Sequence, residues 1–185
     1  MPVTVILAAA QIFAFAQGSK LWIEGDSNLH PWACQATAPE ARIEVDKDAP
    51  EIARALSLKI QVSGLECGSG KMNEKLRDAL NAEQHPTIEY QLTRAERISG
   101  EALQLKATGE LTINGQTRTV AFLVDVVANP DGTADARGEL AIKMSDYGVE
   151  PPTAMLGLLK TYDRITVKFE IRTALRGADA HASLN

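Results

Sequence analysis

The chain has 185 residues, of which 45% are hydrophobic and 23% charged, the proportions of a globular domain and not of a disordered or collagen-like chain. Its 19 basic and 24 acidic side chains give a formal net charge of −5, without a basic stripe along the sequence. Nucleic acid is therefore disfavoured as a partner, and one domain with a sizeable core is expected.

The N-terminal segment has the features of a secretory signal. Residues 1–19 carry no charged side chain, and residues 3–15 are mostly apolar. This stretch is shorter than the roughly 20 apolar residues that span a bilayer. It closes with Ala14-Phe15-Ala16, a pattern that signal peptidase accepts. We expect a signal peptide over residues 1–16, cleaved after Ala16, and an exported mature protein with no stable membrane span. The alternative is a buried N-terminal helix or strand.

Most of the remaining chain alternates between apolar and polar residues with a period of two, as strands with one buried face do. The alternation is strongest over residues 103–113 and 165–171, where apolar or small residues hold the odd positions. This pattern indicates an antiparallel sheet with one face packed on the core and the other exposed to solvent. Similar or weaker alternation occurs at residues 43–45, 56–62, 88–92, 120–126 and 140–144.

Turn residues separate the strands in the middle of the chain. Asn114-Gly115 is a strong hairpin signal because both residues tolerate positive φ. Ser99-Gly100 and the cluster at residues 129–132 are further turn signals. We therefore predict successive hairpins formed by strands at about residues 87–98, 101–113, 118–128 and 135–144.

Two segments depart from the strand period. Residues 72–83 place Met72, Leu76 and Leu80 at helical spacing, and Pro86 follows, so a short helix is expected. Residues 152–159, which begin at the second of two consecutive prolines, predict a helical turn. We expect this apolar turn to cap the core, or to plug or line the mouth of the fold. Residues 17–175 form the expected domain, and residues 176–185 a flexible polar tail.

About eight alternating strands on one domain can close into a barrel, which removes the exposed edges of the sheet. A barrel of eight strands is either filled by side chains or wide enough for one small ligand. The inward positions are almost wholly apolar, so a cavity would suit a hydrocarbon-like guest. Alternation alone does not distinguish a cavity from a dry core.

Three sequence motifs resemble the YceI-like family. Residues 72–90 are similar to its short helix with the proline-containing entry into a strand, residues 107–118 to its G-x-L-T-I-N-G hairpin, and residues 144–149 to its S-D-Y-G element. The resemblance implies an all-β fold: a closed antiparallel lipocalin-like β-barrel with one short helix near 72–83 and a helical turn near 152–159. It also implies a protein exported to the periplasm that holds a long apolar chain, typically a polyisoprenoid, and it brings no catalytic residues.

The predicted function is therefore to sequester or shuttle a long-chain apolar lipid or isoprenoid inside the barrel. Tyr90 has the hydroxyl that could meet a ligand head group or a water at the mouth. The alternative is a structural or stress-related interaction module with a filled barrel and a surface site, and a weaker one is a small hydrolase or isomerase. The sequence does not decide between a monomer and a homodimer. The residues expected to line the cavity are Leu58, Ile60, Tyr90, Leu111, Ile113, Phe122, Val124, Ile142, Met144, Met155, Val167 and Phe169.

The two cysteines, Cys34 and Cys67, are expected to form a disulfide, because an even count in an exported chain favours one. Two free buried thiols and a metal site are the alternatives. His30 and His85 do not complete a recognisable metal-ligand spacing with them. No nucleophile motif is present, and alternation directs Asp125 outward. We therefore expect no cofactor, no metal and no enzymatic activity.

Overall fold

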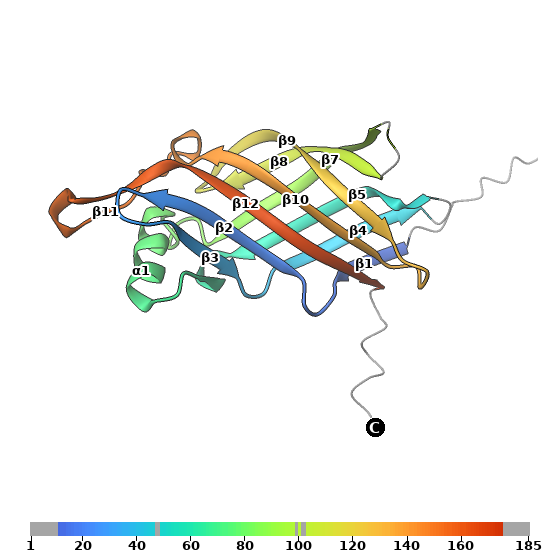
Figure 1. Cartoon of the computed structure of the whole chain (residues 1–185), viewed down its shortest axis with the longest axis horizontal. Coiled ribbons are helices and arrows are strands. Elements are labelled where there is room, and N and C mark those ends of the chain that lie inside the picture. Colours follow the sequence, from blue (N-terminus) through green and yellow to red (C-terminus); the bar gives the residue numbers. More distant parts are fainter. Residues whose placement is uncertain (1–10, 47–48, 99, 101–102, 176–185) are drawn as a thin grey trace, which may run out of the picture.

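The computed structural model describes residues 11–46, 49–98, 100 and 103–175. Strands dominate this part of the chain, with one α-helix and short 3-10 turns (Figure 1). The strands are β1 (Gln11–Phe15), β2 (Lys20–Ser27), β3 (Trp32–Ala36), β4 (Glu40–Asp46), β5 (Ala49–Gln61), β6 (Leu65–Glu66), β7 (Thr87–Ile98), β8 (Gln104–Ile113), β9 (Gln116–Ala128), β10 (Ala134–Lys143), β11 (Thr153–Ala154) and β12 (Leu159–Leu175). The helical elements are η1 (Val62–Gly64), α1 (Gly70–Ala79), η2 (Met144–Tyr147) and η3 (Met155–Gly157).

Over the described residues, the strands form a closed antiparallel barrel with eight positions around the ring. Three of these positions are each filled by two successive strands: β1 with β2, β3 with β4, and β5 with β6. The ring closes because β12 pairs with β2 along most of its length and with β1 near its end. The predicted lipocalin-like barrel of about eight strands is confirmed.

The central hairpins lie where the alternation and the turn residues place them. Strands β7, β8, β9 and β10 pair in chain order, and their bounds differ from the expected ones by a few residues. The β8–β9 turn uses Asn114 and Gly115 at φ 49° and 71°, the left-handed backbone that these two residues adopt most easily. The turn chemistry therefore fixes the register of this hairpin.

Helix α1 covers one end of the barrel, beside β3 and β6 (Figure 1). It begins at Gly70, two residues before the expected start, because Ser69 caps it: its Oγ accepts a hydrogen bond from the Met72 backbone N–H at 3.3 Å. The helix ends at Ala79, before the expected residue 83, and Asn81 follows at φ 49°. Its apolar face, Leu76 and Ala79, packs on the core. No helix in the described ranges is long and apolar enough to cross a bilayer.

The barrel begins earlier in the chain than expected. Residues 11–15, predicted to leave with a signal peptide, form strand β1, which pairs with both β4 and β12. Phe13 is 3% exposed and packs with Ile43 and Val45. Cleavage after Ala16 would thus remove a strand that closes the ring. Residues 1–10 and the expected tail at 176–185 lie outside the described residues.

The helical turn expected near residues 152–159 is present as the short 3-10 turn η3, which follows the two-residue strand β11. Leu156 breaks the helical path at φ 57°. Together with the start of β12, this segment extends beyond the α1 end of the barrel (Figure 1). Leu156 and Leu158 are exposed, so the expectation that they cap the core or plug the barrel is wrong.

Candidate functional site

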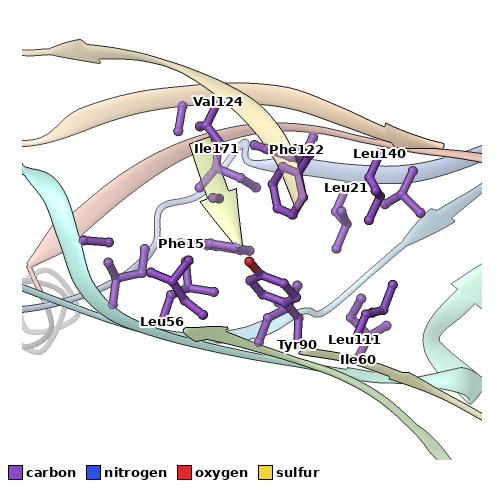
Figure 2. Close-up of a pocket in the computed structure, with 18 of the residues that line it drawn as sticks. Phe15, Leu21, Leu56, Ile60, Tyr90, Leu111, Phe122, Val124, Leu140 and Ile171 are labelled. Atoms are coloured by element: carbon purple, nitrogen blue, oxygen red, sulfur yellow. The ribbon is translucent and has the colours of Figure 1, made fainter. Parts of the chain in front are cut away.

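A cavity of about 240 Å³ lies inside the barrel (Figure 2). Its wall receives side chains from all eight ring positions and is almost wholly apolar. Alternation along β8 shows how the sequence builds it: Leu105, Ala107 and Leu111 line the cavity, while Lys106 and Glu110 between them are exposed. Period-two patterning therefore produces an apolar interior and a polar exterior from the same strands.

Three aromatic rings from different strands meet across the interior. The ring centroids of Tyr90 on β7 and Phe122 on β9 are 5.7 Å apart, and those of Phe122 and Phe169 on β12 are 5.9 Å apart in an edge-on arrangement. These distances and tilts are typical of favourable aromatic pairs. All three rings line the cavity.

Two glycines make room for these rings. A Cβ atom on Gly109 would lie 2.6 Å from the Tyr90 Oη, and one on Gly138 would lie 2.7 Å from the Phe169 Cζ. Contacts below 3.0 Å are essentially never made by real Cβ atoms. Gly109 and Gly138 are therefore required by the close approach of these rings and, nearer still, of the backbone carbonyl oxygens of Gln91 and Leu123.

Tyr90 contributes the polar atom of this aromatic cluster. The residue is 7% exposed, and its hydroxyl has no hydrogen-bond partner among the residues that the structure describes. Burial raises the pKa of Tyr90 to about 12, so the phenol stays protonated at neutral pH. The hydroxyl is thus a neutral donor held in an apolar space.

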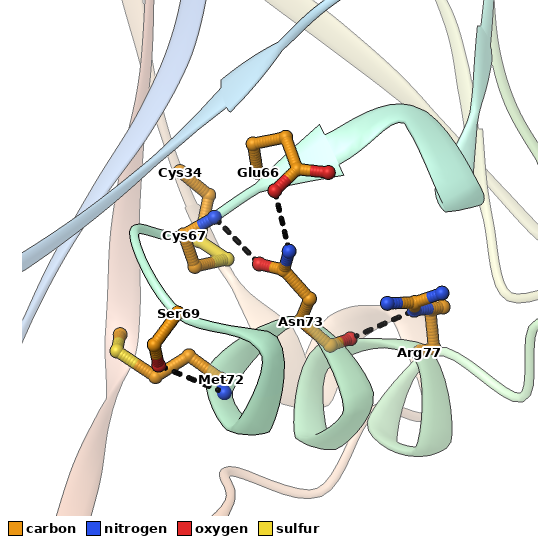
Figure 3. The surroundings of a disulfide bond; sticks show 7 residues. All are labelled: Cys34, Glu66, Cys67, Ser69, Met72, Asn73 and Arg77. Carbon is orange, nitrogen blue, oxygen red and sulfur yellow. Dashed lines mark hydrogen bonds between the residues drawn. A yellow bond between two sulfur atoms is a disulfide. The ribbon is translucent and has the colours of Figure 1, made fainter.

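The α1 end of the barrel is held together by the Cys34–Cys67 disulfide, which confirms the predicted pairing (Figure 3). Cys67 follows β6, and its backbone N–H donates to the Asn73 Oδ1 on α1 at 2.7 Å. The Asn73 side-chain amide donates in turn to Glu66. Because Asn73 is buried and bridges the strand and the helix, α1 is fixed over this end of the barrel.

The cavity reaches the surface toward the opposite end. Its lining there includes Phe15, Ala136 and Thr173, together with Gly132, an exposed residue of the β9–β10 turn. No helix covers this end in the part of the chain that the structure describes. Access for a ligand is therefore expected from the β9–β10 side and not past α1.

Ten of the twelve residues predicted to bind the ligand are on the cavity wall; binding by them stays a prediction. Met144 is buried in the core instead, because β10 ends at Lys143 and Met144 starts η2. The side chain of Met155 lies outside the described residues. Wall residues not predicted include Phe13 and Phe15, which were assigned to the signal, although their spacing two apart fits a strand.

The residues considered for metal binding or catalysis lie apart from the cavity. Both cysteines are in the disulfide, and the described residues contain no group of three or more His, Cys, Asp or Glu placed to hold a metal. Asp125 points outward as predicted: it accepts a hydrogen bond from the Gln104 Nε2 at 2.8 Å and faces the Arg137 Nε at 3.5 Å. These contacts give Asp125 a role on the outer surface.

Comparison with known proteins agrees with this geometry. A family model described as the YceI-like domain matches residues 18–173, as the sequence motifs predict. Burkholderia cenocepacia BcnA superimposes with a TM-score of 0.71 at 22% identity, covering 84% of this chain and 96% of BcnA. No curated protein sequence gives a significant match.

Two further solved structures share the fold. A polyisoprenoid binding domain from Saccharophagus degradans, described as implicated in plant cell wall breakdown, has a TM-score of 0.70 at 14% identity and covers 91% of this chain and 100% of that domain. The Campylobacter jejuni YCEI protein has a TM-score of 0.63 at 22% identity, covering 77% of this chain and 84% of its own. At these identities the likeness shows the fold.

Proposed function

Because the chain belongs to the YceI-like family, we propose that it binds a long apolar chain, such as a polyisoprenoid, inside its barrel. The observation that carries the proposal is the apolar cavity of about 240 Å³, lined from every position of the ring. The S. degradans domain, named for polyisoprenoid binding, has the same fold. The cavity also favours ligand binding over the alternative of a filled barrel that acts only through its surface.

The driving force is the removal of hydrocarbon from water, about 25 cal/mol for each Å² of apolar surface buried. The cavity is slightly smaller than the usual range of roughly 300–1,000 Å³ for ligand pockets. Its size therefore favours a narrow ligand over a bulky one. Binding alone is the proposed activity, because the wall offers no nucleophile with a neighbouring base.

We also propose that the protein acts in the periplasm. The Cys34–Cys67 disulfide supports this location, because such bonds persist in oxidising compartments. A cut after Ala16 would discard β1, whereas a mature protein that begins at or before Gln11 would keep the strand. Cell fractionation followed by N-terminal sequencing tests both points: absence of the protein from the periplasmic fraction contradicts the proposed location, a start at or before Gln11 supports the retention of β1, and a start at Gln17 contradicts that retention.

A cavity-filling variant tests lipid binding. Ala107 lies on the wall and Lys106, the next residue of β8, is exposed, so Ala107→Leu narrows the cavity while Lys106→Leu changes only the outside. Binding is measured with the neutral apolar fluorophore N-phenyl-1-naphthylamine. We expect saturable binding that Ala107→Leu weakens at least tenfold and Lys106→Leu leaves unchanged. Equal affinities in both variants would place the fluorophore outside the barrel and contradict the proposal.

A further inference from the structure

We propose that Tyr90 forms a polar subsite inside the barrel, which receives a neutral oxygen acceptor of the ligand: an alcohol, ether or carbonyl on an otherwise apolar chain. This inference rests on the proposed binding of an apolar chain and adds the chemistry of its polar group. It distinguishes an oxygenated chain from a plain hydrocarbon, and a neutral oxygen from a charged head group.

The position of the Tyr90 hydroxyl carries the inference. Tyr90 is 93% buried, being 7% exposed, and its Oη makes no hydrogen bond. Figure 2 shows the oxygen directed into the space between the side chains of the cavity wall. Burying a hydroxyl without a hydrogen-bond partner is unfavourable. A tyrosine is therefore disfavoured at this position unless a group in the cavity accepts a hydrogen bond from its hydroxyl.

The wall does not offer a substitute partner. Thr173 is the other hydroxyl-bearing residue of the lining, and its Oγ1 already accepts a hydrogen bond from the Ala134 backbone N–H at 2.8 Å. The Trp22 indole N–H donates to the Glu24 Oε1 at 2.7 Å. A single buried water needs two to four polar partners, which the side chains around Tyr90 do not supply.

The position of the ring is built by its neighbours. Gly109 on the adjacent strand admits the phenol, since a Cβ atom there would lie 2.6 Å from both the Cζ and the Oη of Tyr90. On the opposite side the ring meets Phe122, with centroids 5.7 Å apart. The hydroxyl is therefore held in one place, as a directional contact with a ligand requires.

The surroundings select a neutral group. No lysine, arginine or histidine is among the lining residues that the structure describes, so a phosphate or carboxylate at this depth would be a buried charge without a counter-ion. The phenol itself stays protonated at neutral pH, because burial raises its pKa to about 12. A charged head group would have to remain at the open end, near Gly132.

Three probes with the same 15-carbon chain test the subsite: farnesene without oxygen, farnesol with a neutral oxygen, and farnesyl phosphate with a charged one. Each is titrated into the wild-type protein and into Tyr90→Phe by displacement of N-phenyl-1-naphthylamine. Tyr147→Phe is the matched control, because Tyr147 is also buried with an unpartnered hydroxyl but is not part of the cavity wall.

We expect Tyr90→Phe to weaken farnesol binding five- to a hundredfold, the range for an oxygen left unpaired in an apolar site, and to leave farnesene unchanged. Farnesyl phosphate should be insensitive to the same substitution, and Tyr147→Phe should change none of the three. Equal farnesol affinity in wild type and Tyr90→Phe would overturn the proposed subsite. In that case, binding of farnesene to the wild type would still support the proposed apolar cavity. If no probe binds the wild type, both proposals are overturned.

Discussion

Removal of the Cys34–Cys67 disulfide should cost a calculable part of the stability of the fold. The bond joins β3 to the residue that follows β6 and closes a loop over a sequence separation of 33. In the chain-entropy treatment, a loop of this length corresponds to about 3.7 kcal/mol of stabilisation at 25 °C. For a chain of this size, the melting temperature should fall by about 7–15 °C.

The assay is denaturant unfolding of the wild type and of the Cys34→Ala/Cys67→Ala double variant, each with and without reductant. Reduced wild type and the double variant should both lose about 3–4 kcal/mol, and reductant should not affect the variant. Affinity for an apolar probe should persist in the folded variant, because neither cysteine is on the cavity wall. A loss below about 1 kcal/mol in both cases would refute the reasoning that this bond limits the unfolded chain.

Other regions give further expected outcomes. Deleting residues 1–16 should lower the free energy of unfolding by at least about 3 kcal/mol more than deleting residues 1–10, because only the longer deletion removes the buried Phe13. Equal denaturation curves for the two deletions would contradict a structural role for β1. Gly109→Ala should press on both the Gln91 backbone carbonyl and the Tyr90 ring, and so lower the free energy of unfolding as well as the farnesol affinity, as checked by denaturant unfolding and by displacement of N-phenyl-1-naphthylamine. The Ser145 backbone N–H and side-chain hydroxyl donate hydrogen bonds to Asp163 and lower the pKa of the Asp163 carboxyl. The stability that the ionised Asp163 contributes is therefore complete above the unfolded-state pKa of 3.8 and is lost as the pH falls through the lower folded-state pKa. Asp163→Asn should therefore destabilise the protein more at pH 7 than at pH values below 3.8, as denaturant unfolding on both sides of that pH will show.

Much of the barrel is encoded locally and could be predicted. Each strand from β7 to β10 has one apolar and one polar face, so the period alone shows which side is buried. The Asn114-Gly115 turn then sets the pairing of β8 with β9. For residues 11–15 the sequence left a signal peptide and a buried strand as alternatives, because the two have the same apolar composition; the pairing of β1 with β4 and β12 appears only in the structure.

The details of the cavity depend on contacts that alternation does not contain. Met144 continues the apolar series of β10, yet the chain turns into η2 there and carries its side chain into the core. Leu156 and Leu158 are apolar but exposed, since they lie on a segment beyond the barrel. The unpartnered Tyr90 hydroxyl also required the structure, because it depends on which groups face it across the ring.

Native mass spectrometry of the protein purified from periplasm, followed by organic extraction, tests the central claim most directly. The account predicts a discrete added mass that extraction removes and that matches a long apolar molecule with a neutral oxygen. It also predicts that Ala107→Leu reduces the occupied fraction while Lys106→Leu does not. A bare polypeptide mass with no extractable lipid, from cells in which the protein is exported and its disulfide formed, would contradict the claim that the barrel holds an apolar ligand.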